Sequence, residues 1–316
     1  MNTEHLEHSK KKLPRVLRIE PASKCNLACT HCPTGTIDQE RGLMTKETFA
    51  NVLRSLVGHE DYVKVVVLYH GGEPLLNKRF FSMVEELRKY LPMAHFKTVS
   101  NGMVLTKVNI SKILESSLNA IEFSLDGLSP AESEKIRINS DTNRILNNIN
   151  DLIKNSEKFY SSKLKVSIAT TQFIEKKVFP VNEPKTPEWL RKIFGNKVAY
   201  KPTYALKWPH MEILNSQESK GGLYDLVQDP DGEDSNSCDH LANTITIRAN
   251  GDVVPCCYDL TSKLVMGNVN SQNLFSIWSS QKYDDLRNSI MAKNYQSICA
   301  SCAVVRPPVY LIPTWR

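Results

Sequence analysis

The chain has 316 residues, of which 41% are hydrophobic and 23% are charged, and its net charge at pH 7 is +6. This composition excludes a wholly disordered chain, and the apolar runs are too short for a helix that spans a membrane. Lys and Arg are spread along the chain rather than clustered, so no nucleic-acid partner is expected. The basic stretch near the N-terminus precedes no apolar core of a secretory signal, so we expect a cytoplasmic protein without a membrane partner.

Strand-like and helix-like segments alternate between residues 15 and 173. Apolar residues at helical spacing predict helices, and β-branched or aromatic runs predict strands. The expected strands are residues 16–20, 64–69, 96–99, 120–125 and 164–170, and the expected helices are residues 46–56, 79–90, 109–116, 129–137 and 142–159. Strands joined by helices of this length indicate a parallel sheet with crossover helices, which is an α/β fold.

The pattern changes twice in the rest of the chain. A stretch rich in proline and charge predicts a connection with a helix over residues 187–194 and an extended piece over residues 198–208. After Cys238, residues 244–248 and 253–255 flank Asn250-Gly251, a strong hairpin signal, and residues 274–290 are expected to form one helix. The chain divides at these changes into a tail (1–14), a core (15–173), a connection that completes the side of the core (174–236) and a C-terminal domain (237–316).

The eight cysteines fall into two groups, with none between Cys32 and Cys238. In a reducing cytosol, clustered cysteines indicate metal or redox chemistry rather than disulfides. The first group, Cys25, Cys29 and Cys32, is a CxxxCxxC run directly after the first expected strand. A structural zinc site takes four ligands, usually from paired CxxC turns, and no fourth cysteine is near. Three thiolates suit a cubane iron–sulfur cluster with one iron left open for a small ligand.

Three further motifs follow expected strands. They are His70-Gly71-Gly72-Glu73-Pro74, Ser100-Asn101-Gly102 and Ser124-Leu125-Asp126-Gly127. Glycines let the main chain approach a ligand, and Glu73 can stabilise an ammonium group. Ser124 and Asp126 point to the same face by the two-residue period of a strand. Each motif taken alone is also compatible with an ordinary turn.

The CxxxCxxC run and the GGEP motif together resemble those of radical S-adenosylmethionine (SAM) enzymes. The resemblance implies a partial (β/α)6 TIM-like barrel with a [4Fe–4S] cluster on Cys25, Cys29 and Cys32. The open iron would be chelated by the amino and carboxylate groups of SAM. One electron from the cluster would cleave SAM to methionine and a 5′-deoxyadenosyl radical, which abstracts hydrogen from the substrate. A one-electron reductant such as flavodoxin or ferredoxin is then an expected partner.

The same resemblance implies which residues contact SAM. The implied contacts are the backbone of Gly71, Gly72, Glu73 and Pro74 for the SAM amino group, Ser124 and Asp126 for its ribose and methionine ends, and Asn101 in the weaker Ser-Asn-Gly element. No clear match to the family's adenine-binding motif is found near residues 164–171.

The second cysteine group also resembles a family pattern. Cys238 is followed by twelve residues, Gly251, four residues and Cys256, and Cys299 and Cys302 form a later CxxC. This resembles the SPASM or shorter twitch extension of radical SAM enzymes, as do residues 266–269 and 274–278. The resemblance implies a small α+β domain with one auxiliary [4Fe–4S] cluster on Cys238, Cys256, Cys299 and Cys302, for two clusters in all. A four-cysteine zinc site is the alternative.

Several polar residues near these groups have more than one interpretation. Cys257 is either a hydrogen donor to a substrate radical, as in some radical SAM epimerases, or an inert buried thiol, or the ligand in place of Cys256. Asp259 is either a base or an ordinary hairpin carboxylate. Arg18 and Glu20 share one face of the first strand, where they touch substrate or form a salt bridge that closes the barrel.

The expected activity is therefore oxidation or epimerisation of a carbohydrate-type or peptide substrate. Oxidation requires the auxiliary cluster to accept an electron, and epimerisation requires Cys257 to return a hydrogen atom. A peptide substrate would dock through residues 173–236. The rival hypothesis is a non-catalytic iron–sulfur or zinc-binding scaffold, in which Glu73 and Asp126 would be dispensable.

Overall fold

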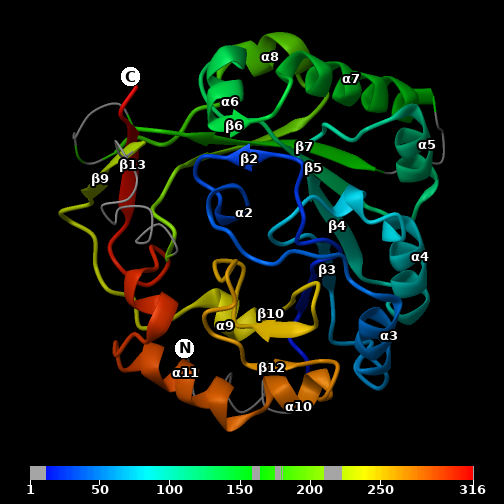
Figure 1. Ribbon diagram of the computed structural model, residues 1–316, viewed down its shortest axis with the longest axis vertical. Coiled ribbons are helices and arrows are strands. Elements are labelled where there is room, and N and C mark those ends of the chain that lie inside the picture. Colours follow the sequence, from blue (N-terminus) through cyan, green and yellow to red (C-terminus); the bar gives the residue numbers. More distant parts are fainter. Residues whose placement is uncertain (1–11, 159–163, 175–178, 180, 210–222, 316) are drawn as a thin grey trace.

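Six parallel strands form the curved centre of the fold (Figure 1). The computed structural model describes residues 12–158, 164–174, 179, 181–209 and 223–315. The six strands are, in their order across the sheet, β1 (Val16–Ile19), β3 (Val65–Leu68), β4 (His95–Ser100), β5 (Ala120–Ser124), β7 (Lys165–Gln172) and β8 (Ala199–Tyr204). Every neighbouring pair is parallel. The α/β class and the partial (β/α)6 barrel expected from the sequence are confirmed.

Helices cover the outer face of this sheet. They are α3 (Lys46–Arg54), α4 (Phe80–Tyr90), α5 (Lys107–Glu115), α7 (Thr142–Lys158) and α8 (Glu188–Phe194). Each matches an expected helix within about two residues. Residue 159, the last residue of the helix expected over 142–159, lies outside the described residues. The helix expected over 129–137 is α6 (Pro130–Ile136), which starts after Ser129 caps it by accepting from Glu132 N–H.

Alternation along the strands separates an apolar outer face from a polar inner face. Outward side chains such as Leu17, Val66 and Phe123 are fully buried against the helices. The residues between them are polar in several strands and include Arg18 and Glu122. Because successive side chains of a strand point to opposite faces, these polar groups face the inside of the partial barrel.

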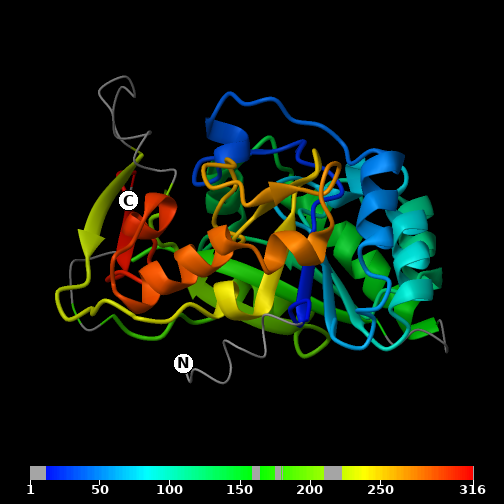
Figure 2. The same ribbon diagram turned by 90° about the horizontal axis from the view of Figure 1, so that it is seen from below.

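The segment after Cys238 adds three strands to the edge of the same sheet, beside β1 (Figure 2). After the short helix α9 (Asp239–Asn243), β10 (Thr244–Ile247) pairs parallel with β1, and β11 (Asp252–Val254) and β12 (Gly267–Asn268) follow antiparallel. The expected hairpin is confirmed, and Gly251 takes the positive φ of 92° that its turn requires.

The single helix expected over residues 274–290 is wrong. The structure has two helices, α10 (Leu274–Trp278) and α11 (Gln281–Met291). Ser280 breaks the helical run because its side chain accepts a hydrogen bond from Tyr283 N–H and caps α11. Apolar periodicity continued across this break, so the pattern alone did not reveal it.

Several short elements were not expected from the sequence. They are β2 (Ala28–Cys29), which pairs with β6 (Arg137–Ile138), β9 (Tyr224–Gln228), which pairs with β13 (Val309–Pro313), the helix α2 (Pro33–Thr36) and the 3-10 turns η1 (Pro74–Leu76) and η3 (Ser297–Ser301). The β2–β6 pair fixes the first cysteine loop to the segment that follows α6. No helix in the described part of the chain is long and apolar enough to cross a bilayer.

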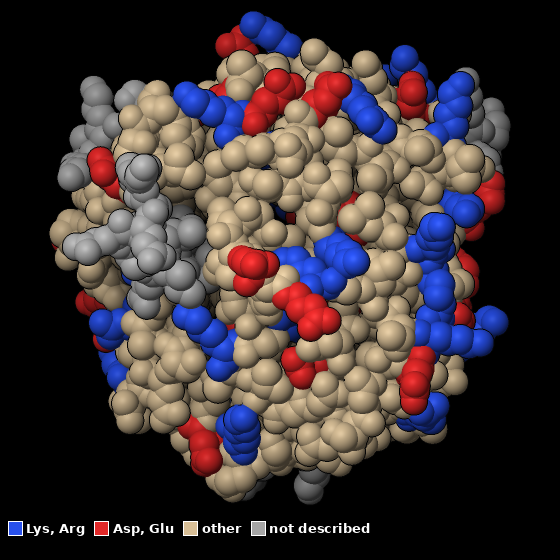
Figure 3. All heavy atoms as spheres, viewed as in Figure 1, with Lys and Arg blue, Asp and Glu red and all other residues tan. Residues whose placement is uncertain are grey.

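The surface mixes charges of both signs. On the face shown in Figure 3, Lys and Arg lie among Asp and Glu rather than in one large basic field. This distribution agrees with the spread of basic residues along the sequence.

Glu20, at the end of β1, joins three segments of the inner face. Its carboxylate is fully buried and accepts hydrogen bonds from Gly71 N–H at 2.9 Å and from Ala249 N–H at 3.0 Å. The Arg248 guanidinium lies 3.4 Å from the same carboxylate. Of the two interpretations of Glu20, the structure therefore has the salt bridge, which holds the C-terminal hairpin and the loop after β3 to the first strand.

We expect Glu20→Gln to lower the thermal unfolding midpoint by several degrees. The amide carries one acceptor in place of a charged carboxylate, and charged hydrogen bonds contribute about 1.5–3 kcal/mol each. Differential scanning calorimetry would measure this, with Glu188→Gln, on the exposed surface of α8, as the matched control. Equal midpoints for the two variants would contradict the joining role of Glu20.

Candidate functional site

The first cysteine group lines a cavity at the carboxyl ends of the parallel strands. Residues from eight segments line it: Cys25, Cys29, His31, Cys32, Pro33, Tyr69, Gly71, Gly72, Glu73, Val99, Ser100, Asn101, Ser124, Asp126, Arg137, Ala169, Thr171, Trp208 and Leu260. The structure thus brings together every candidate residue for the first cluster and SAM except Pro74. Pro74 instead begins η1 behind the cavity wall. Ala169 and Thr171 come from the stretch in which no adenine-binding motif was found.

The cysteine loop is held to the strand ends by short contacts. Asn101 donates from Nδ2 to the Asn26 side chain at 2.9 Å, and the same nitrogen lies 3.7 Å from Cys25 Sγ. Thr34 donates its hydroxyl to Gly71 O at 2.6 Å. These contacts fix the loop over the ends of β3 and β4, where the GGEP and Ser-Asn-Gly segments begin.

Gly72 of the GGEP segment packs against the backbone that leads into the cysteine loop. A Cβ atom on Gly72 would lie 2.4 Å from both Ala22 O and Lys24 O. Glu73 N–H donates to Lys24 O at 2.8 Å. Gly72 is therefore required where two main-chain segments meet, in addition to any approach to a ligand.

Glu73 is a buried carboxylate with three hydrogen-bond donors. It accepts from Ser100 Oγ at 3.0 Å, from Asn101 N–H at 2.8 Å and from Leu75 N–H at 3.2 Å. Burial raises the pKa of Glu73 to about 7, although these hydrogen bonds oppose the rise. The carboxyl group is thus held in one orientation at the cavity wall, and its pKa lies close to neutral pH.

Asp126 forms a buried ion pair with Arg137. The Arg137 guanidinium donates to Asp126 Oδ2 at 2.8 Å, and His31 Nε2 lies 3.9 Å from the same oxygen. Burial would raise the pKa of Asp126, but Arg137 and His31 hold it below its ordinary value. Asp126 also accepts from Thr171 N–H at 3.0 Å, so its orientation is fixed.

The three thiols fit an iron–sulfur cluster with an open coordination site. All three are free and face the cavity, and burial raises the pKa of Cys25 and raises that of Cys29 to about 12. Buried thiolates need compensating positive charge, which a metal supplies and which Arg137, beside Cys29 across the β2–β6 pair, supports. The polar groups Glu73, Ser124 and Asp126 share the cavity with them, as a small zwitterionic ligand requires.

Four cysteines of the second group lie in the main apolar core. Cys256, Cys299 and Cys302 are buried in it and Cys238 packs against it, whereas Cys257 is not part of this core. Burial, together with the charges of neighbouring thiols, raises the pKa of Cys299 to about 12 and that of Cys302 to about 11. Their mutual electrostatic influence shows that these thiols lie close to one another.

Within the described residues, no three His, Cys, Asp or Glu side chains converge as they would around a single metal ion. The thiolates of a four-iron cluster are held farther apart, because each binds a different iron atom.

Cys257 lies near these cysteines, since its charge raises the pKa of Cys238, Cys256 and Cys302, but it differs from them in having an imidazole neighbour. Its Sγ lies 3.9 Å from His240 Nε2. Burial would raise the pKa of Cys257, but the contact with His240 and the charge of Arg18 lower it below its ordinary value. Asp259 accepts from Lys263 N–H and Leu264 N–H at 2.9 and 2.8 Å, which is the bonding of an ordinary turn carboxylate.

Some lining residues carried no sequence signal. Arg137 resembles any other basic residue after a helix, and only the β2–β6 pairing reveals that it lies beside Cys29. Trp208 comes from the connection that the sequence left without motifs. His31 and Tyr69 are adjacent to motifs that were identified, so proximity in sequence was a usable signal for them.

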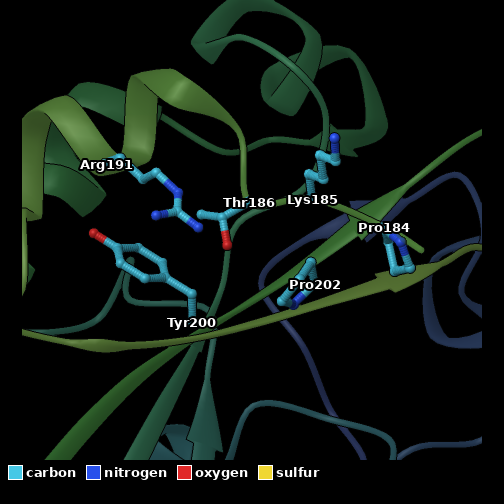
Figure 4. A pocket seen from close by; sticks show the side chains of 6 residues that line it. All are labelled: Pro184, Lys185, Thr186, Arg191, Tyr200 and Pro202. Carbon is cyan, nitrogen blue, oxygen red and sulfur yellow. The ribbon is translucent and has the colours of Figure 1, made fainter. Parts of the chain in front are cut away.

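A second hollow lies on the outer side of the barrel, between α8 and β8 (Figure 4). It is lined by Pro184, Lys185, Thr186, Arg191, Tyr200 and Pro202 and shares no residue with the cysteine-lined cavity. In Figure 4 the Arg191 guanidinium lies beside the Tyr200 ring, 5.8 Å from its centroid. It falls in the segment through which a peptide was expected to dock.

Comparison with known proteins agrees with this geometry. A family model described as the radical SAM superfamily matches residues 19–163, and the SPASM model, described as an iron–sulfur cluster-binding domain, matches residues 238–303. The chain is a radical SAM enzyme with a SPASM domain. It therefore uses SAM, a [4Fe–4S] cluster and auxiliary iron–sulfur ligation, as the resemblance implied.

Similar proteins include two curated relatives and one solved structure. The radical SAM chain is 24% identical to the tungsten-containing aldehyde ferredoxin oxidoreductase cofactor-modifying protein of Pyrococcus furiosus, over 92% of this chain and 87% of the relative. It is 22% identical to the S-adenosyl-L-methionine-dependent 2-deoxy-scyllo-inosamine dehydrogenase of Niallia circulans, over 92% and 93%. The structure of BtrN in complex with AdoMet and 2-DOIA superposes with a TM-score of 0.60 at 18% identity, over 92% and 93%.

We expect iron to divide between the two cysteine groups. After anaerobic reconstitution the wild-type chain should hold about eight irons with matching sulfide, and the triple Ser variants of Cys25/Cys29/Cys32 and of Cys238/Cys299/Cys302 about four each. Elemental analysis for iron, sulfide and zinc would check this. Cys256→Ser should lose iron and Cys257→Ser should retain it; the reverse would assign the fourth auxiliary ligand to Cys257.

We expect Gly72→Ala to destabilise the protein by about 1–3 kcal/mol, because the added methyl group meets two backbone carbonyls that cannot move independently. Gly42→Ala is the matched control, since nothing lies within 4 Å of its Cβ position. Unfolding midpoints of both variants would be compared with the wild type. A Gly72→Ala variant as stable as Gly42→Ala would show that the two backbones do not pack as described.

Proposed function

We propose that this enzyme oxidises a carbon centre of a small substrate by radical SAM chemistry, with an auxiliary [4Fe–4S] cluster on Cys238, Cys256, Cys299 and Cys302 as the electron acceptor. The observation that carries the proposal is the single cavity shared by the three thiols, the GGEP segment and the ends of β4, β5 and β7. A non-catalytic scaffold gives no reason for Glu73 and Asp126 to lie in that cavity.

When bound, a cluster on Cys25, Cys29 and Cys32 would supply the electron for reductive cleavage of SAM, which gives the radical that abstracts hydrogen from the substrate. The protein's part is to bind and orient. The three cysteines would ligate three irons, and Glu73 would accept a hydrogen bond from the SAM amino group. Ser124 and Asp126 fix its polar ends, and the buried Asp126–Arg137 pair holds that carboxylate in place.

The loop that follows Cys256 and Cys257 borders the first cavity, which supports electron transfer to the second cysteine group. His70, in the GGEP segment, has Nε2 at 3.2 Å from Asp259 O in the loop after Cys256 and Cys257. Leu260 from the same loop lines the first cavity. Trp208, also on the cavity wall, has its ring centroid 5.0 Å from that of Tyr258. A substrate radical in this cavity would lose an electron to the auxiliary site and a proton to a nearby base, which completes a two-electron oxidation.

Two further points support a small-molecule substrate. The relative that is a 2-deoxy-scyllo-inosamine dehydrogenase is matched over nearly all of both chains, and the solved BtrN structure contains 2-DOIA. A carbohydrate-type substrate is accordingly the first choice, with a peptide bound across the hollow of Figure 4 as the second. The proposed electron donor is flavodoxin or ferredoxin.

Epimerisation is the second candidate function, and the position of Cys257 favours it. This thiol is not part of the apolar core that contains the other four cysteines, and the charges of His240 and Arg18 act on it. A thiol at this position can return a hydrogen atom to a substrate radical from the side opposite SAM. The Cys257 thiyl radical left behind would then take up one electron and one proton, so the reductant supplies two electrons per turnover while the substrate keeps its oxidation state.

The expected outcome for oxidation is that turnover in deuterated solvent leaves no deuterium at the reacting carbon. Mass spectrometry of the product, with 5′-deoxyadenosine measured in the same sample, would check this once a substrate is supplied. Cys257→Ala should then turn over as the wild type does. Deuterium in the product that disappears in Cys257→Ala would instead establish epimerisation.

A further inference from the structure

The inner face of the sheet carries a second layer of side chains below the cysteine-lined cavity. Tyr69, Val99, Ser124 and Ala169 line the cavity, and two positions earlier in the chain stand Val67, Lys97, Glu122 and Ser167. Residues two apart in a strand face the same side, about 6.6 Å from each other along the strand. Arg18 is the register partner of Val67 and belongs to the same lower layer. We call these five residues (Arg18, Val67, Lys97, Glu122 and Ser167) the lower layer.

Positive charge is in excess in the lower layer. Glu122 is its single acid, and one of its oxygens, Oε2, accepts from Lys97 Nζ at 2.8 Å and from Lys201 Nζ of the neighbouring β8 at 2.6 Å. Two ammonium groups therefore share one carboxylate oxygen. Arg18 takes part in none of the hydrogen bonds or ion pairs found among the described residues. Three cations thus face one carboxylate at this level of the inner face.

Two buried polar atoms beside each other lack partners. Arg18 Nε is inaccessible to solvent and has no hydrogen-bond acceptor, and the same is true of Thr246 Oγ1 as a donor and acceptor. Thr246 is fully buried on β10 and is the register partner of Arg18. Unsatisfied buried polar groups destabilise a fold unless a ligand pairs with them. The row Thr246, Arg18, Val67 and Lys97 crosses four adjacent strands on one face.

The location of Arg18 is between the two cysteine groups. Burial raises the pKa of Tyr69, on the cavity side, and the charge of Arg18 opposes that rise. On the other side, Arg18 is among the groups that lower the pKa of Cys257. Arg248, the nearby cation on β10, already pairs with Glu20. Arg18 is therefore a cation of this region that no carboxylate of the described residues pairs with.

We infer that the lower layer binds an anionic group of the substrate, a carboxylate or a phosphate, with Arg18 as its principal donor and Lys97, two strands away on the same face, as a second donor. The inference rests on the proposed function, because it places the substrate one layer below SAM. A guanidinium presents a fork of N–H groups that matches two oxygens of such an anion. Glu122 occupies one of the three donors of the Lys97 ammonium, which leaves the others for the ligand.

The competing role for Arg18 is to balance the charge of the auxiliary cluster. Charge near an iron–sulfur cluster sets its reduction potential, and Cys257 stands next to a proposed ligand. That role needs no ligand on the inner face and leaves Thr246 Oγ1 unpaired. The unpaired Thr246 hydroxyl beside Arg18, with the second cation Lys97 on the same face, is better explained by a substrate anion.

The test is titration of the anaerobically reconstituted, SAM-bound enzyme with inorganic phosphate and with acetate by isothermal calorimetry. We expect one site per chain for at least one anion. Its affinity should fall at least tenfold in Arg18→Gln, less in Arg18→Lys and Lys97→Gln, and not at all in Lys192→Gln on the exposed surface of α8. Absence of binding of both anions to the wild type, or equal affinity in Arg18→Gln, would overturn the inference.

Two accompanying measurements separate the alternatives. Iron content and reductive SAM cleavage, measured in the same samples, test the proposed function. Anion binding without SAM cleavage would contradict the proposed function but would support the anion site. A redox titration followed by electron paramagnetic resonance reports on the auxiliary cluster. A shifted potential with unchanged phosphate and acetate affinity in Arg18→Gln would assign Arg18 to the cluster. If Arg18→Gln loses iron, Arg18→Lys and Lys97→Gln decide: weakened affinity in both supports the site, and wild-type affinity in both overturns it.

Discussion

Parallel strands joined by crossover helices all end at one edge of their sheet, and the whole candidate site depends on that constraint. Cys25, Glu73 and Asp126 are far apart in sequence, yet each follows a strand of the same sheet and all line one cavity. The outward side chains of these strands pack against the helices. The polar side chains that can contact SAM or substrate therefore lie on the inner face and at the strand ends. The fold therefore fixes where SAM and substrate can meet before any single residue is considered.

Backbone and side-chain contacts together hold the cysteine loop. The loop is joined to β6 by two-residue pairing and to the GGEP segment through Lys24 O, and the Glu20 side chain joins the GGEP segment to the first strand. Gly72 is required at one of these junctions by the closeness of two main chains. The GGEP motif, which the sequence suggests for ligand binding, thus also positions the cluster loop. Gly72 serves both roles.

The sequence was most informative where the physical signal is local. Apolar periodicity located the strands and helices of the barrel, and spacing identified both cysteine groups, because each signal lies within a short window. It failed where pairing is between distant segments. The parallel pairing of β10 with β1, the pairing of Cys29 with Arg137 and the ion pair of Glu20 with Arg248 each join residues that no local pattern relates. The break before Ser280 was missed for the opposite reason, since a capping side chain outweighed a continuous apolar pattern.

Buried charge links these features to one another. The pKa of Cys29 is raised to about 12 and that of Cys302 to about 11, so without metal both thiols are protonated at neutral pH and the buried groups remain uncharged. Cluster assembly exchanges those protons for iron, which is why it becomes more favourable as the pH rises. In the first cavity, Arg137 offsets the negative charge of the thiolates, and its ion pair with Asp126 holds the guanidinium in place. Among the described residues, Arg18 has no carboxylate partner comparable to Asp126. A substrate anion on the inner face would provide one.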